Sequence, residues 1–337
     1  MVFYLHKYYL CLRILIFLLY MNMKKTFLAT ICFMASMTGY AQQIDVQPTP
    51  QQIKATTETI ELNGNYLLNG ENEANPYAVS GLKTLLGGNY AAKEGIKVFI
   101  GERGDKAVRK YNKFIPKQKE GYFLRIQPKE IVLAGNDEQG TFYALQTLEQ
   151  LLKDNQLPVA DITDYPEITF RGVVEGFYGA PWSHEARLRH LKFYGQNKMN
   201  TYIYGPKDDP YHSSPNWRLP YPEQEAKQIK ELVQIAKENA VNFVWAIHPG
   251  KDIKWNQEDR DNLLGKFQKM YELGVRSFAV FFDDISGEGT NPDRQAELLN
   301  YIDEQFVKVK KDVTPLIMCP TEYNKSWSNV KGGYLTT

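Results

Sequence analysis

Two aspartates stand side by side at the end of an apolar run, in the stretch FAVFFDDISGEG from Phe278 to Gly289. Removing a carboxylate from water is costly unless something pairs with it or uses it, and two adjacent carboxylates also repel each other. Side chains alternate in direction along a strand. Asp283 and Asp284 can therefore reach one site together only where the strand ends and the chain bends into a loop.

The residues alone leave three interpretations of this pair open. The sequence DDISGEGTNPD is rich in turn residues and would also suit a helix cap or a loop turn. With Glu288 nearby, the two aspartates could ligate magnesium or calcium, which take oxygen ligands, although no further ligand cluster stands out. Paired carboxyl groups are also the usual apparatus of glycoside hydrolysis.

Adjacent aspartates suit one form of glycoside hydrolysis in particular. In that form one carboxylate orients the 2-acetamido group of the substrate, whose oxygen attacks the anomeric carbon, and the other acts as general acid and then as general base. Carboxylates so close cannot both ionise easily, so one would retain a proton near neutral pH, as a general acid requires. Aromatic-rich loops such as GFYGAPW and CPTEYNKSW would support a sugar ligand, although core aromatics explain many of these residues.

The elements that must position the pair alternate strictly between strand and helix after Glu167. Near-continuous apolar runs predict five buried parallel strands in TFRGVVEG, NTYIYGP, NFVWAIHPG, SFAVFFDD and PLIMCPTE. Helical patterns lie between them at residues 183–198, 223–239, 259–273 and 292–310. A doubly wound sheet and a TIM-type (β/α)8 barrel both fit. Polar or aromatic residues recur at the C-terminal end of every strand, which favours the barrel.

Five strands are fewer than the eight of a closed barrel. We expect either a smaller architecture or, as we favour, a catalytic barrel truncated after about five strands. Missing strands would leave unpaired sheet edges and an open core. We therefore expect the chain by itself to be inactive or poorly folded, and a full-length gene product to be active.

A mixed pattern before the barrel predicts a small α+β domain at residues 42–166. KVFIGE, YFLRIQ and EIVLAG are typical of short strands, and TFYALQTLEQLLK carries one apolar stripe at helical spacing. DITDYPEITFRG is the expected hinge, with Pro166 closing the domain. Residues 167–337 would then form the partial barrel.

Residues 1–41 are typical of a targeting region. From Met23, MKKTFLATICFMASMTGYAQQ has two lysines, an apolar run and small residues up to Ala41, which predicts a secretory signal cut after Ala41. The apolar stretch before Met23 could be a membrane anchor, but we favour a translation start at Met23. We expect an exported protein, periplasmic or secreted, with no stable membrane partner after cleavage.

Charge and cysteine content exclude several other classes. The 40 Lys and Arg nearly balance the 39 Asp and Glu, so nothing indicates a nucleic-acid partner. Cys11 and Cys32 fall in the targeting region, which leaves Cys319 alone in the mature chain. An intrachain disulfide, a zinc cluster or a CxxC redox site is therefore not expected.

Five motifs in order carry a resemblance to a known family: RGVVEGFYGAPWS, YIYGPKDDPYH, WAIHPG, FFDDISGE and CPTEYNKSW. Together they resemble glycoside hydrolase family 84, the bacterial O-GlcNAcase-type β-N-acetylglucosaminidases. The earlier GYFLRIQPKEIVLAGNDEQGTFYALQTLEQLL resembles the small N-terminal domain that this family shares with other hexosaminidases. The likeness runs from about Gln43 to Thr337.

The resemblance implies a retaining exo-β-N-acetylglucosaminidase that works through an oxazoline intermediate, without cofactor or metal. It would act on terminal β-linked N-acetylglucosamine of glycans or glycoproteins. Asp283 would orient the acetamido group and Asp284 would be the acid/base. One alternative is a remnant that binds N-acetylglucosamine without cutting, because the later strands are missing. A weaker one is an extracellular metal-dependent hydrolase.

The resemblance also implies roles for residues of the other strand ends. Gly176 would offer a backbone contact to a sugar hydroxyl, and Tyr178 would help to shape the pocket. Lys207 would bind a sugar hydroxyl, Tyr323 would donate to the developing oxazoline, and Cys319 would line the acetamido pocket. Taken singly, Lys207 would be a solvated loop lysine and Cys319 a buried small apolar residue.

Overall fold

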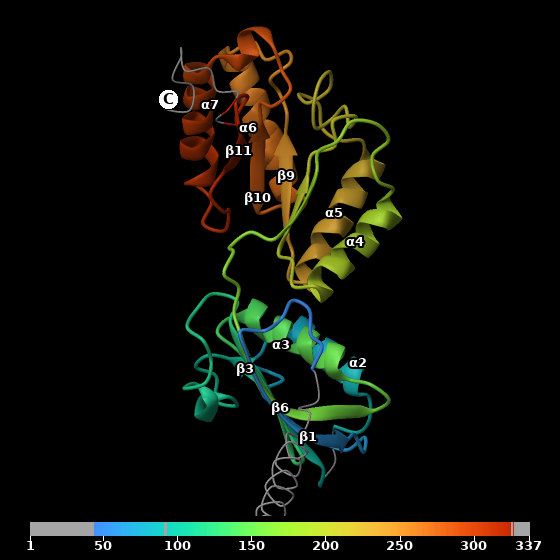
Figure 1. Ribbon diagram of the computed structural model, residues 1–337. Helices are drawn as coiled ribbons and strands as arrows, with labels where there is room; N and C mark the ends of the chain where they lie inside the picture. The colour runs from blue at the N-terminus through green and yellow to red at the C-terminus, as the bar shows by residue number, and fades with distance from the viewer. Residues whose placement is uncertain (1–43, 91–92, 325, 327–337) are drawn as a thin grey trace, which may run out of the picture.

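The computed structural model describes residues 44–90, 93–324 and 326, and shows two parts, each with its own sheet, stacked along the long axis of the molecule (Figure 1). The predicted secretory signal and its cleavage point lie outside the described residues. Across the ranges that are described, no helix has the length and apolar character needed to cross a membrane.

The N-terminal part is a six-stranded mixed sheet with helices packed on it. Its elements are β1 (Gln52–Glu61), β2 (Tyr66–Asn69), α2 (Pro76–Leu86), β3 (Ile96–Glu102), β4 (Tyr122–Gln127), β5 (Glu130–Gly135), α3 (Glu138–Leu151) and β6 (Gln156–Asp164). The strand order is β1-β6-β4-β5-β3-β2. Asp137 caps α3 by accepting a hydrogen bond from the Gly140 amide at 2.9 Å. The apolar face of α3 then packs on the central strands.

The sequence patterns located only part of this sheet. The predicted strands at β3, β4 and β5 and the helix at α3 are present. The periodicity missed β1, β2 and α2, and the expected hinge overlaps the last strand. Residues 161–164 belong to β6, which pairs antiparallel with both β1 and β4. The polar DITD sequence is thus a strand because its backbone is hydrogen-bonded on both sides.

The C-terminal part is a curled, all-parallel five-stranded sheet. Its strands are β7 (Gly172–Glu175), β8 (Thr201–Tyr204), β9 (Asn242–Ile247), β10 (Ser277–Phe281) and β11 (Ile317–Cys319). Its helices are α4 (His184–Gln196), α5 (Glu223–Glu238), α6 (Gln257–Glu272) and α7 (Pro292–Ile302), the last continued by one π-helical turn, Asp303–Val307. The spatial order β11-β10-β9-β8-β7 follows the chain. This is the first part of a (β/α) barrel, as predicted.

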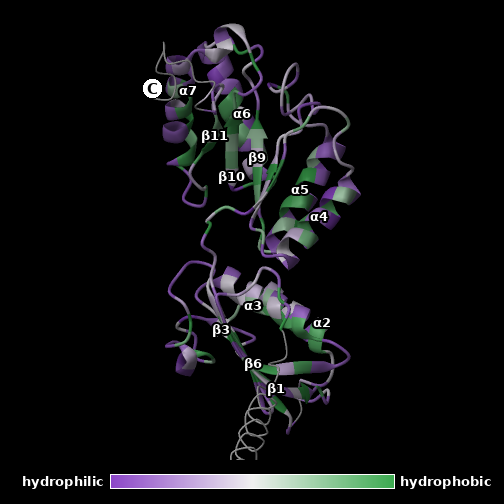
Figure 2. Cartoon of the chain, in the orientation of Figure 1, coloured by the Kyte–Doolittle hydropathy of each residue, from purple (hydrophilic) through white to green (hydrophobic). Residues whose placement is uncertain are grey.

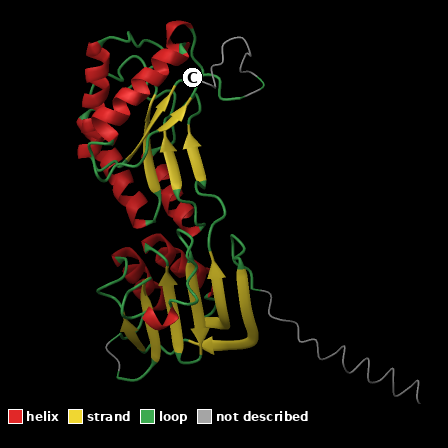
Figure 3. Ribbon diagram, turned by 90° about the vertical axis from the view of Figure 1, so that its left-hand side faces the viewer, coloured by secondary structure: helices red, strands yellow, loops and turns green. Residues whose placement is uncertain are grey.

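The helices of this part lie on one face of its sheet, as Figure 3 shows. Strands β9 and β10 are hydrophobic and α7 is largely hydrophilic (Figure 2), as expected for buried parallel strands under solvated helices. The packing between them is aromatic. The ring of Phe267 on α6 lies 4.9 Å from that of Phe278 and 6.0 Å from that of Trp245.

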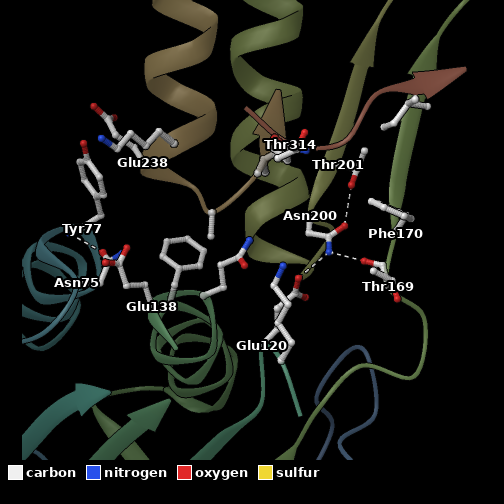
Figure 4. A pocket seen from close by; sticks show the side chains of 18 of the residues that line it. Asn75, Tyr77, Glu120, Glu138, Thr169, Phe170, Asn200, Thr201, Glu238 and Thr314 are labelled. Atoms are coloured by element: carbon white, nitrogen blue, oxygen red, sulfur yellow. Dashed lines mark hydrogen bonds between the residues drawn. The ribbon is translucent and has the colours of Figure 1, made fainter. Parts of the chain in front are cut away.

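Buried polar contacts join the two parts at the N-terminal ends of the parallel strands (Figure 4). Glu120 accepts hydrogen bonds from Arg171 at 2.5 Å and from Asn200 at 2.9 Å. Behind them the buried Lys198 ammonium donates to the Tyr122 hydroxyl at 2.9 Å. A cavity of about 480 Å³ opens beside Glu120 and Asn200. It lies at the opposite end of the strands from the aspartate pair.

Candidate active site

The aspartate pair follows the end of β10, where the chain leaves the sheet. The strand ends at Phe281, and the buried Phe282 amide still donates to the Cys319 carbonyl at 2.9 Å. Asp284 then takes a left-handed backbone conformation with φ of 53°, which breaks the alternation of a strand. Asp283 is partly buried and Asp284 is exposed.

Asp283 is held by groups that follow the two preceding strands, β8 and β9. Lys207, which follows β8, places its ammonium 2.6 Å from Asp283 Oδ2, and only 2% of the Lys207 side chain is exposed. His248, which follows β9, lies with Nε2 2.7 Å from the backbone carbonyl oxygen of Asp283. These two contacts hold both the carboxylate and the backbone of Asp283.

The second oxygen of the same carboxylate, Asp283 Oδ1, is buried and has no hydrogen-bond partner among the described residues. His248 Nε2 lies 3.7 Å from it, which is too far for a hydrogen bond. A buried acceptor without a hydrogen bond costs free energy, which a donor from a ligand would recover. Asp283 therefore presents one anchored oxygen and one available acceptor.

The loop after β7 brings Tyr178 to the pair. Burial raises the pKa of Tyr178, and the negative charges of Asp284 and Asp283 raise it further. Asp208 fixes the loop by accepting a hydrogen bond from the Gly179 amide at 2.6 Å. The Lys251 ammonium lies 5.6 Å from the centre of the Tyr178 ring.

The beginning of this loop is set by a fully buried carboxylate. Glu175 accepts hydrogen bonds from the Arg187 guanidinium at 2.9 and 2.7 Å and from the Trp182 amide at 3.0 Å. Gly176 comes next. A Cβ atom there would meet only the Val174 side chain, at 3.2 Å. Backbone clashes therefore do not require glycine at this position, and its bare backbone remains accessible to a ligand.

Cys319 ends β11 and lies opposite Phe281 in register. Burial raises the pKa of the Cys319 thiol to about 11, and the charge of Asp283 adds to the effect. The thiol is therefore neutral near pH 7 and close to Asp283. Tyr323, four residues further on, is 51% exposed.

The structure thus brings Asp283, Asp284, Lys207, Tyr178 and Cys319 to one edge, and places Gly176 and Tyr323 in the loops of that edge. Lys207 is not the solvated loop lysine that it could have been, because it is buried and paired. The roles suggested by the resemblance stay predictions.

Sequence reasoning did not identify the contribution of His248 or Asp208. Both directly follow or adjoin predicted strand ends, so position was the only signal. Glu288, which the metal interpretation placed near the pair, is ion-paired with Arg294 at 3.1 Å and has a 79% exposed side chain. Within the described ranges, no three His, Cys, Asp or Glu side chains are grouped as a metal site would require.

Comparison with known proteins gives matches along most of the chain. Residues 171–337 match the family described as beta-N-acetylglucosaminidase, and residues 43–165 match glycosyl hydrolase family 20, domain 2. Protein O-GlcNAcase of Rattus norvegicus and that of Mus musculus are each 36% identical over 158 residues, which cover 45% of this chain and 17% of theirs.

Two solved structures share the fold of both parts. CpGH84B superposes with a TM-score of 0.77 and 40% identity, over 83% of this chain and 51% of its own. CpGH84D gives 0.73 and 29%, over 82% and 50%. The chain thus spans about half the length of these solved chains and less than a fifth of the curated relatives.

Proposed function

Because the chain belongs to glycoside hydrolase family 84, the O-GlcNAcase type, we propose that it acts as a retaining exo-β-N-acetylglucosaminidase. The observation that carries the proposal is the asymmetric aspartate pair. Asp283 is anchored by Lys207 at 2.6 Å, and the next residue, Asp284, is exposed in a left-handed turn. Two adjacent carboxylates in such different surroundings suit two different roles.

Asp283 supports the nucleophile, which comes from the substrate. Its buried Oδ1 accepts the acetamido N–H, and this contact directs the acetamido oxygen at the anomeric carbon. The positive charge that develops as the oxazoline ring closes lies next to the carboxylate. The Lys207 ammonium holds the Asp283 carboxylate in position, which prepares the site before the substrate binds.

Asp284 supplies and then removes the proton. In the first step the acetamido oxygen forms a bond to the anomeric carbon, the glycosidic bond breaks, and Asp284 protonates the leaving oxygen. In the second step the Asp284 carboxylate takes a proton from water, whose oxygen attacks the anomeric carbon and opens the oxazoline. Each step inverts the configuration at the anomeric carbon, so the product retains the configuration of the substrate.

The remaining residues would form the walls of the sugar site. Tyr178 lies near the exposed aspartate and Cys319 near the anchored one, since the charge of each aspartate raises the pKa of its neighbour. The bare backbone at Gly176 is open to a sugar hydroxyl. Lys207 and Tyr323 are further candidates for hydroxyl or oxazoline contacts. The substrate class is terminal β-linked N-acetylglucosamine on glycans or glycoproteins.

A binding remnant that holds the sugar without cutting it is the second candidate. The observation that favours it is that the sheet of the described residues is open, with β7 and β11 as its edge strands. An open sheet surrounds a bound sugar on fewer sides than a closed barrel does. The two candidates differ in turnover, and both predict affinity for N-acetylglucosamine.

The test is hydrolysis of aryl β-N-acetylglucosaminides by the 337-residue chain and by the longest form that its gene encodes. We expect turnover by the form in which the sheet closes into a barrel. Asp284→Ala should lose about 10²–10⁴-fold activity on a substrate with a poor leaving group, and much less on one with a good leaving group. Sugar binding without turnover in either form would support the remnant instead.

We also propose export to the periplasm or medium through the signal ending at Ala41. Amino-terminal sequencing of the mature protein should begin at Gln42. A start at Met1 or Met23 would contradict it.

A further inference from the structure

The peptide bond that joins the two aspartates has its own anchor. We propose that His248 is a positioning residue, which holds the carbonyl of Asp283 and thereby fixes the left-handed turn that points Asp284 into the site. This inference rests on the proposed hydrolase function. It concerns the backbone between the carboxylates, whereas Lys207 acts on the carboxylate of Asp283.

The hydrogen bond itself fixes the form of the imidazole. His248 Nε2 lies 2.7 Å from the Asp283 carbonyl oxygen, which can only accept. Nε2 must therefore carry a proton and donate it. Burial lowers the pKa of His248, and the nearby Lys207 charge lowers it further. The ring is thus neutral, and its buried Nδ1 has no hydrogen-bond partner in the described part of the chain.

The backbone that carries the His248 ring is held by the neighbouring chain, so the donor can act as a fixed point. The His248 amide donates to the His212 carbonyl at 2.9 Å. This contact uses the backbone of His212 and not its ring, and the rings of both histidines are fully buried. The donor that reaches Asp283 therefore belongs to the packed interior of the sheet and not to a loose loop.

The bonded carbonyl is the one whose direction matters for Asp284. Left-handed backbone is uncommon for residues other than glycine, and Asp adopts it only when its surroundings support it. Asp284 has φ of 53°. Rotating out of this conformation would swing the Asp283–Asp284 peptide and carry its carbonyl away from Nε2. The hydrogen bond opposes that rotation, and so it holds the Asp284 carboxylate in place relative to Asp283.

The separate roles of Lys207 and His248 lead to a specific prediction. Lys207 still anchors the Asp283 carboxylate when the His248 donor is lost, so assistance to the acetamido nucleophile should stay largely intact. Proton donation by Asp284 should suffer, because a misplacement of about 1 Å can cost about 100-fold in rate. Substrates whose leaving groups need no protonation should escape most of that loss.

The test compares His248→Phe, which keeps the ring without the donor, with His248→Gln, whose amide nitrogen can reach about the same point. His212→Phe is the matched control, because it removes an equally buried ring whose centre lies 6.2 Å from that of His248. Each variant is assayed in the active form of the protein on aryl β-N-acetylglucosaminides that span good to poor leaving groups.

We expect His248→Phe to lose about 100-fold in kcat on the poorest leaving group and about tenfold or less on the best. His248→Gln should recover most of the difference. His212→Phe should lower all rates by one common factor. Equal losses across leaving groups for His248→Phe, or no recovery with Gln, would overturn this inference alone. A wild type without activity on any substrate would overturn the proposed function and this inference with it.

Discussion

Replacing Lys207 by methionine tests how much the ion pair with Asp283 contributes to the stability of the fold. The two charged atoms are 2.6 Å apart, and the exposed fractions of the side chains are 2% for Lys207 and 17% for Asp283. Methionine keeps most of the buried volume and removes the charge. The Asp283 carboxylate is then left partly buried, with the neutral His248 as its nearest side-chain donor, 3.7 Å from Oδ1.

The expected loss of folding stability follows from the burial of the pair. Removing one member of a buried ion pair costs about 3–5 kcal/mol, and the remaining water contact of Asp283 places the loss near the lower limit, about 3 kcal/mol. Changing both members to neutral residues removes the stranded charge. The double variant Lys207→Met with Asp283→Asn should therefore be more stable than Lys207→Met by about 1–3 kcal/mol.

The assay is thermal unfolding, followed by the aromatic signal of the C-terminal part. A loss of about 3 kcal/mol should lower the midpoint by about 6–12 °C in a unit of this size. Lys251→Met is the matched control, since it removes the same charge from an exposed lysine 5.6 Å from the Tyr178 ring, and it should cost at most about 1 kcal/mol. Equal shifts for Lys207→Met and Lys251→Met, or a double variant no more stable than Lys207→Met, would refute the reasoning.

Three further predictions concern buried or partly buried groups. Burial lowers the pKa of Lys266 to about 8, below its value of about 10.4 in an unfolded chain. Between these pH values the unfolded state binds more protons than the folded state, so the free energy of unfolding should rise from pH 8 to pH 10.4. Urea titrations should show this rise in the wild type and its loss in Lys266→Met. Because the pKa of Cys319 is about 11, iodoacetamide at pH 8 should modify it about 100 times more slowly than an exposed cysteine, and peptide mapping that finds equal rates would contradict this. Glu120→Gln should weaken the contact with Arg171 between the two parts, and limited proteolysis should then cut residues 165–170 faster than in the wild type.

Sequence periodicity predicted the parallel sheet well because its signal is redundant. Each strand is a continuous apolar run, and each helix between them shows its own stripe, so five strands and four helices appear where expected. The N-terminal sheet was harder. Strand β1 alternates poorly, with many exposed threonines and glutamates, and β6 carries polar residues that the ladders with β1 and β4 hold in place.

The candidate site could be predicted in its types of residue but not in its contacts. Adjacent aspartates at a strand end indicated a catalytic site, and the motifs of the other strand ends indicated which residues surround it. No sequence rule showed that Lys207 would turn inward to meet Asp283, or that His248 would bind a backbone carbonyl. Both contacts join residues far apart in the chain, and only the curl of the sheet brings them together.

The central claim is that the acetamido group of the substrate is the nucleophile. The most direct measurement is kcat/KM for aryl glycosides in which the acetyl group carries zero, one, two or three fluorines, assayed with the active form of the protein. Fluorine withdraws electrons from the acetamido oxygen, so kcat/KM should fall with each fluorine, by about tenfold or more across the series, which corresponds to about 1.4 kcal/mol or more of activation free energy. Rates that do not change across the series would show that another group attacks the sugar, and would contradict the account.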